Sequence, residues 1–168
     1  MIILVLGGAR SGKSAVAETL ARRSPAPVTY VATSVANPDD PELEARIAAH
    51  VERRPPEWAI VEASPTTLTS VLRATTGTVL VDALGAWVAA SPDLGVDPVD
   101  LCDALRTRGG DSVVVSDEVG LGVHPSSEVG RRFRDVLGQL NQAVAGVADQ
   151  VLLVVAGRTL ALSELAAP

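Results

Sequence analysis

Eight residues near the start of the chain, Gly7-Gly8-Ala9-Arg10-Ser11-Gly12-Lys13-Ser14, match the pattern G-x-x-x-x-G-K-[ST]. In this pattern the glycines let backbone N–H groups surround phosphate oxygens, the lysine reaches the β- and γ-phosphates, and the hydroxyl binds Mg²⁺. An apolar run at residues 2–6 precedes the pattern, and a helical pattern at residues 14–23 follows it. Because a phosphate-binding loop joins a strand to a helix, we predict that all eight residues bind a nucleoside triphosphate, with Lys13 catalytic and Ser14 on the metal.

Lys13 is the only lysine in the chain, whose other 13 basic residues are all arginine. A bias toward arginine that spares one position indicates that arginine cannot serve there. The lack of a second lysine also argues against a regulatory GTPase, whose guanine-binding Asn-Lys-x-Asp element requires one.

Along the rest of the chain, apolar runs alternate with helical patterns. Within each run apolar residues are continuous, which is typical of parallel strands buried on both faces. Strands are predicted at residues 2–6, 28–32, 58–63, 78–81, 112–116 and 151–155, with a short edge strand at 160–162. Helices are predicted at residues 14–23, 42–54, 66–75, 97–108 and from Ser126 or Ser127 to about 148, while residues 83–91 are ambiguous. The expected fold class is α/β, a P-loop NTPase-type, mostly parallel sheet flanked by helices on both faces. Residues 1–168 are expected to form a single nucleotide-binding domain.

Composition narrows the classes of partner. The formal charge is −6 and aromatic residues make up 2% of the 168 residues, so neither a basic surface nor a base-stacking surface for nucleic acid is expected. The apolar run at residues 2–6 is too short for a signal sequence, and no stretch approaches the length of a membrane span. The single cysteine, Cys102, cannot form an internal disulfide. We therefore expect a soluble, cytoplasmic protein with no nucleic-acid partner and no membrane insertion.

Two strand ends supply candidate acids for Mg²⁺. Asp82 closes the run at residues 78–81, and Asp117 and Glu118 close the run at residues 112–116. A phosphate loop needs such an acid at the end of a buried strand. We favour Asp82 as the metal-side acid with Ser14, and keep Asp117 or Glu118 as the alternative.

The two histidines differ in their surroundings. His50 is preceded by Arg46 and followed by Arg53 at helical spacing. Flanking guanidiniums lower the pKa of an imidazole and hold an anion, so a neutral His50 could attack a phosphate; the alternative is a solvated histidine at a helix end. His124 lies in a loop with no evident partner, and we expect no role for it.

Taken in order, these motifs resemble the bifunctional adenosylcobinamide kinase / adenosylcobinamide-phosphate guanylyltransferase family over residues 2 to about 158. The matching segments are Gly7–Ser14, Tyr30-Val-Ala-Thr-Ser34, Arg46-Ile-x-x-His50, Arg54-Pro55, Trp58, Glu118-Val-Gly-Leu-Gly122, Pro125, Arg132-Phe-Arg-Asp135, Leu140-Asn-Gln142 and Ala148-Asp149.

The resemblance implies two reactions. ATP or GTP phosphorylates the aminopropanol hydroxyl of adenosylcobinamide, and His50 then takes GMP from GTP and passes it to adenosylcobinamide phosphate, giving adenosylcobinamide-GDP and pyrophosphate. It implies GTP, ATP and Mg²⁺ as cofactors, a small-molecule corrinoid substrate and a homotrimer. Besides the phosphate loop, it implies nucleotide contacts at Ala32, Thr33, Ser34, Val51, Glu52, Arg53, Arg54, Glu62 and Asp82.

The chain departs from the family pattern at three positions. Asp82 stands where the family can have Glu, Asp117 stands where Asn is expected, and His124 replaces an apolar residue. The alternative function is another small-molecule P-loop kinase, which would share the phosphate loop without needing a histidine–GMP intermediate.

Overall fold

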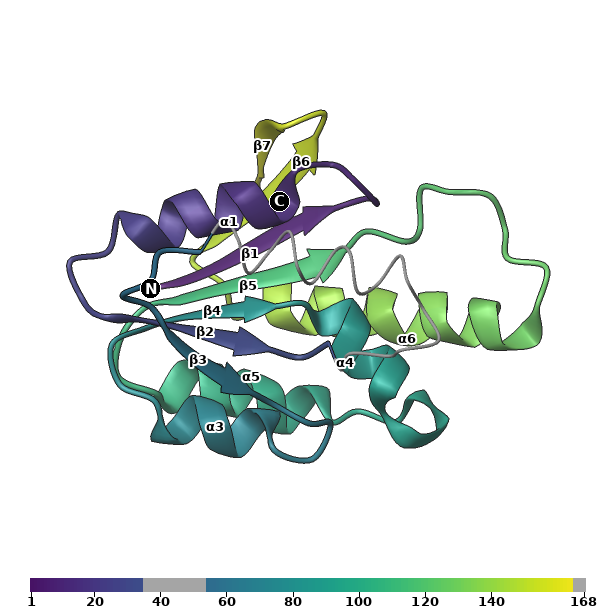
Figure 1. The fold of residues 1–168 in the computed structure, drawn as a ribbon. Helices are drawn as coiled ribbons and strands as arrows, with labels where there is room; N and C mark the ends of the chain where they lie inside the picture. Colours follow the sequence, from purple (N-terminus) through teal and green to yellow (C-terminus); the bar gives the residue numbers. More distant parts are fainter. Residues whose placement is uncertain (35–53, 165–168) are drawn as a thin grey trace.

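A seven-stranded sheet with the order β3-β2-β4-β5-β1-β6-β7 forms the centre of the computed structural model, which describes residues 1–34 and 54–164 (Figure 1). The strands are β1 Ile2–Gly7, β2 Val28–Ala32, β3 Ala59–Glu62, β4 Thr78–Asp82, β5 Ser112–Asp117, β6 Gln150–Val155 and β7 Arg158–Leu162. The helices are α1 Lys13–Arg22, α3 Leu68–Ala74, α4 Leu84–Ala90, α5 Pro98–Thr107 and α6 Glu128–Ala145, with a 3₁₀ turn η1 at Pro92–Leu94.

All strand pairings are parallel except that of β6 with β7. Every residue of β7 is exposed, and the strand returns antiparallel through a tight turn in which Ala156 and Gly157 both have positive φ. The predicted edge strand at residues 160–162 is therefore confirmed as the last part of β7. Because parallel strands end at a common edge, the carboxyl ends of β1, β2, β3, β4 and β5 lie together.

Two apolar clusters cover the two faces of the sheet. Alternate residues of one strand belong to different clusters, as Leu4 and Val5 of β1 do. The first cluster joins the sheet to α3, α4, α5 and α6, whereas the second joins it to α1 through Ala17 and Ala21. Figure 1 shows α1 on one side and α3, α5 and α6 on the other. The predicted α/β class, with helices on both faces, is confirmed.

Most element boundaries differ from the predictions by only a few residues. The ambiguous segment 83–91 contains helix α4, since Leu84, Trp87 and Val88 form one buried face. Helix α6 begins after Ser127, whose side chain accepts from the Gly130 N–H, and it ends at Ala145 before Gly146, earlier than predicted. Almost all of the helix predicted at residues 42–54 lies outside the described residues.

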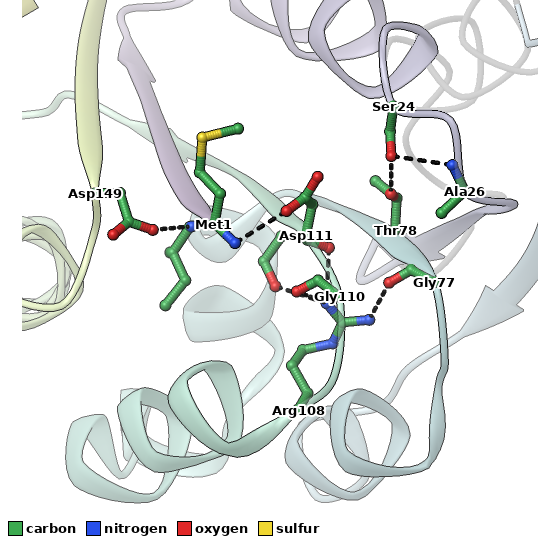
Figure 2. Close-up of polar contacts among 11 residues, drawn as sticks. Met1, Ser24, Ala26, Gly77, Thr78, Arg108, Gly110, Asp111 and Asp149 are labelled. Carbon is green, nitrogen blue, oxygen red and sulfur yellow. Dashed lines mark hydrogen bonds and ion pairs between the residues drawn. The ribbon is translucent and has the colours of Figure 1, made fainter.

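The buried side chain of Arg108 ties together two turns at the amino edge of the sheet (Figure 2). Its Nη1 atom donates to the carbonyls of Gly110 and Asp111 at 3.1 and 2.7 Å, and its Nη2 atom donates to the carbonyl of Gly77 at 2.8 Å. These carbonyls precede β5 and β4, so one guanidinium holds the starts of two central strands in place.

In the part of the chain that the structure describes, no helix combines the length and the apolar character needed to cross a bilayer.

Candidate nucleotide-binding site

The phosphate loop connects β1 to α1 at the carboxyl edge of the sheet, as predicted. Gly12 has φ +92° and Arg10 has φ 55°, so the chain turns sharply before the helix begins. A Cβ on Gly7 would collide with the Ser11 side chain and lie 2.8 Å from the Val154 carbonyl oxygen. The Gly157 N–H donates to the Ser11 carbonyl at 2.8 Å. The turn after β6 therefore stabilises the phosphate loop through this hydrogen bond.

Lys13 is buried within this loop and its side chain turns back over it. Its Nζ atom donates to the Gly8 carbonyl at 3.2 Å and pairs with Asp117 Oδ1 at 2.9 Å. The ammonium group thus lies beside the loop backbone, whose N–H groups would bind a triphosphate.

Ser14 and Asp82, which are predicted to bind the metal, are in contact with each other. Ser14 Oγ donates to Asp82 Oδ1 at 3.3 Å, and Asp82, the last residue of β4, is only 9% exposed. The second carboxylate oxygen accepts from the Tyr30 hydroxyl at 2.7 Å. Hydroxyls from α1 and β2 thereby orient one carboxylate at the carboxyl edge.

Tyr30 acts as a fixed donor to this carboxylate. Burial, followed by the negative charge and hydrogen bond of Asp82, raises the pKa of the Tyr30 hydroxyl far above its ordinary value, while Arg54 opposes the shift. The phenol therefore keeps its proton. The Arg54 guanidinium stacks on the Tyr30 ring, with its central carbon 3.5 Å from the ring centroid. Arg54 is thus brought next to the Asp82 site.

The predicted contacts on β2 and β3 meet Asp82 along the same edge. Ala32 pairs in register with both Asp82 and Glu62. Thr33 is buried, and its hydroxyl donates to the Ala83 carbonyl at 2.7 Å. Ser34 follows directly, while Glu62 is exposed at the end of β3. The ends of β2 and β3 therefore continue the carboxyl edge of the sheet beyond β4, on the side away from β1.

The two alternative acids have other partners. Asp117 pairs with Lys13, and the Glu118 carboxylate accepts from the N–H groups of Gly120 and Leu121 at 2.8 and 3.0 Å. Glu118 thus stabilises its own loop, whereas Asp82 accepts from Ser14. This geometry favours Asp82 as the metal-side acid.

Four of the predicted residues, His50, Val51, Glu52 and Arg53, lie outside the described residues. The expectation that His124 has no partner is wrong, because Arg134 Nη1 lies 2.9 Å from its Nδ1 atom. An arginine can only donate, so Nδ1 is the acceptor. Arg134 is ten residues away, on α6, which hides the pair from a local pattern.

Ser14 and Asp82 offer a hydroxyl and a carboxylate, which are oxygen ligands of the kind that Mg²⁺ takes. Residues 1–34 and 54–164 contain no group of three or more His, Cys, Asp and Glu side chains that could hold a metal. Mg²⁺ is commonly held by one or two oxygen ligands together with phosphates and water. Ser14 and Asp82 fit that requirement.

Sequence reasoning missed two contacts at this site, Tyr30 with Asp82 and Asp117 with Lys13. Tyr30 occupies an ordinary strand position, and no local pattern marks its hydroxyl as a partner for a residue on β4. Both contacts depend on the strand order, since β2 lies beside β4, and β1 lies beside β5, although neither pair of strands is consecutive in sequence.

Comparisons with known proteins identify the family of this chain. The family model described as "Cobinamide kinase / cobinamide phosphate guanyltransferase" matches residues 3–162. The bifunctional adenosylcobalamin biosynthesis protein CobP of Pseudomonas aeruginosa is 40% identical, over 92% of each chain. The bifunctional adenosylcobalamin biosynthesis protein CobU of Salmonella typhimurium is 38% identical, over 94% of this chain and 97% of its own.

Solved structures of two type III secretion ATPases share the fold, with TM-scores of 0.55 and 0.54 at 11% and 12% identity. They cover 90% and 92% of this chain, which spans 50% and 43% of theirs.

Proposed function

Because this chain belongs to the cobinamide kinase / cobinamide phosphate guanyltransferase family, it is an enzyme of cobalamin biosynthesis with kinase and guanylyltransferase activity, and we propose how its residues divide the two reactions. In the first, ATP or GTP phosphorylates the aminopropanol hydroxyl of adenosylcobinamide at the phosphate loop. In the second, His50 carries GMP from GTP to adenosylcobinamide phosphate. The contact between Ser14 and Asp82, 3.3 Å long across 68 residues of sequence, is the observation that carries the first assignment.

In the kinase step, the hydroxyl oxygen attacks the γ-phosphorus and the bond to the nucleoside diphosphate breaks. Lys13 supplies positive charge to the β- and γ-phosphates, and the N–H groups of the loop bind their oxygens. Mg²⁺, when bound by Ser14 and Asp82, would neutralise charge that develops on the phosphate oxygens. Tyr30 holds the Asp82 carboxylate in orientation through its 2.7 Å hydrogen bond.

In the guanylyl transfer, a neutral His50 nitrogen attacks the α-phosphorus of GTP and pyrophosphate leaves. A phosphate oxygen of adenosylcobinamide phosphate then attacks the histidine-bound GMP, the P–N bond breaks, and His50 is regenerated. Two observations support this role. Arg46 and Arg53 flank His50 in sequence, and Arg54, four residues after it, stacks on Tyr30 beside Asp82.

The experiment is incubation with α-labelled GTP and Mg²⁺, followed by mapping of the labelled residue. We expect an acid-labile, base-stable adduct in the wild type and none in His50→Asn, which should keep most of its kinase turnover because the phosphate loop is intact. The matched control is His124→Asn, which should keep the adduct. Label on His50→Asn, or on His124 of the wild type, would contradict the assignment. Kinase turnover with no adduct in the wild type would instead identify a P-loop kinase without the histidine intermediate.

A further inference from the structure

Asp117 forms an ion pair with Lys13 of the phosphate loop. The two reactions do not by themselves require this ion pair. Lys13 Nζ contacts Asp117 Oδ1 at 2.9 Å and the Gly8 carbonyl oxygen at 3.2 Å. An ammonium group has three protons, and these contacts use two of them. A triphosphate at the loop must therefore share Lys13 with a carboxylate.

The fold holds Asp117 in this position. Asp117 pairs in register with Gly7, the first residue of the loop. Its backbone carbonyl accepts from Asn141 Nδ2 at 3.0 Å, and Asn141 in turn accepts from Ser116 Oγ at 2.6 Å. A Cβ on Gly85 of α4 would collide with the Asp117 carboxylate, so the glycine there leaves the space that this side chain fills.

The charge of Asp117 opposes phosphate binding. The Lys13 and Asp117 side chains are 11% and 32% exposed, so solvent screens their interaction only in part. A carboxylate next to the lysine repels the β- and γ-phosphates and competes with them for the same ammonium protons.

We propose that Asp117 is a positioning residue that keeps Lys13 aimed at the loop and weakens nucleotide binding by competing for its charge. Weaker phosphate binding favours release of the nucleoside diphosphate after phosphoryl transfer. This inference rests on the proposed function, in which the triphosphate lies at the phosphate loop.

The test measures the Kd of non-hydrolysable GTP and ATP analogues by calorimetry for the wild type and Asp117→Asn, with and without Mg²⁺. Asparagine fits the same space and its amide oxygen can accept from Lys13, but it carries no charge. We expect the triphosphate Kd to fall about tenfold in both conditions, equivalent to about 1.4 kcal/mol. Guanosine and adenosine should bind equally well to both proteins, which a general rearrangement of the site would not produce.

Asp103→Asn on α5 is the matched control, because it removes one carboxylate from an exposed ion pair with Arg73 of α3. Its triphosphate Kd should stay within about twofold of the wild type, as expected for a surface pair. An unchanged or raised triphosphate Kd in Asp117→Asn would overturn the inference, and loss of the Mg²⁺-dependent part would make Asp117 a metal ligand instead. An equal shift for the nucleosides would also overturn it. A wild type that binds no triphosphate would overturn the proposed function, and this inference with it.

Discussion

Side chains from α1, β2, β4 and β5 meet at the carboxyl edge of the sheet. Asp82 accepts from Ser14 and Tyr30, while Lys13 lies between Gly8 and Asp117. Each charged group thus has a fixed partner within the protein. Preorganisation of this kind lets charged groups act on a transition state with little reorganisation.

Lys13→Ala should reduce kinase turnover at least about 10²-fold, because no other lysine exists to reach the β- and γ-phosphates. Lys13→Arg should also lose most activity, since a planar guanidinium does not replace a compact ammonium in this loop. Thermal unfolding of both variants should stay close to that of the wild type, because the lysine contacts the loop and not the apolar core. Near-normal turnover of γ-labelled nucleotide in Lys13→Ala would refute the assignment.

Asp82→Asn should lower Mg²⁺-dependent turnover about 10²-fold or more, because the amide keeps only one of the two acceptor oxygens that Ser14 and Tyr30 use and loses the charge that binds the cation. Titration of kinase activity with Mg²⁺ measures the effect. Glu118→Gln, which changes an acid that binds its own loop, serves as the comparison. Loss of the Mg²⁺ response in Glu118→Gln with retention in Asp82→Asn would show that the metal-side acid lies on the neighbouring strand.

Among the elements, α6 has a defined start at Ser127. Its hydroxyl accepts from the Gly130 N–H at 3.1 Å, which satisfies one of the unpaired donors in the first turn. Ser126 instead contributes its backbone carbonyl, which accepts from Arg131 at 2.9 Å.

Ser127→Ala should lower the free energy of unfolding by about 1 kcal/mol, the usual cost of losing an N-cap side chain. Ser126→Ala keeps the backbone carbonyl and should change it by less than about 0.5 kcal/mol. Urea unfolding at 25 °C measures both. Equal losses in the two variants would show that the hydroxyl of Ser127 is not the cap that matters.

At the scale of the whole molecule, Arg108 connects the turn before β4 with the turn before β5, which are far apart in the sequence. Besides Gly77, Gly110 and Asp111, its guanidinium donates to the Thr75 carbonyl and the Ser112 hydroxyl, at 3.2 and 2.9 Å. Burial lowers the pKa of Arg108 below its ordinary value. The side chain is therefore a buried cation stabilised mainly by the carbonyl oxygens of two turns.

Arg108→Met should lower the free energy of unfolding by about 3 kcal/mol, because it removes the guanidinium that donates to the part-buried carbonyls of Thr75, Gly77 and Gly110. Arg106→Met removes an exposed arginine from α5, which ends just before Arg108, and should change the free energy of unfolding by less than about 0.5 kcal/mol. Denaturant unfolding with both variants provides the comparison. A loss below about 1 kcal/mol in Arg108→Met would mean that water or the chain itself satisfies these carbonyls.

The phosphate loop and the α/β class could be predicted from the sequence because both depend on local patterns. A glycine is needed where Gly12 has φ +92° and where a side chain on Gly7 would meet Val154. Likewise, β4 and β5 consist of continuous apolar runs because both of their faces are covered. Close backbone approach and two-sided burial each restrict the residue types allowed at a position, and the restriction is visible without knowing the neighbours.

Which acid meets which loop residue was decided only by the tertiary structure. Asp82 and Asp117 both end buried strands and are equivalent as patterns. The order β4-β5-β1 places Asp117 opposite Gly7 and beside Lys13, and leaves Asp82 to reach Ser14 from one strand further away. The contacts of Tyr30 with Asp82 and of His124 with Arg134 likewise join residues on separate elements. Strand order arises from the packing of all the helices and strands together, so no single stretch of sequence contains it.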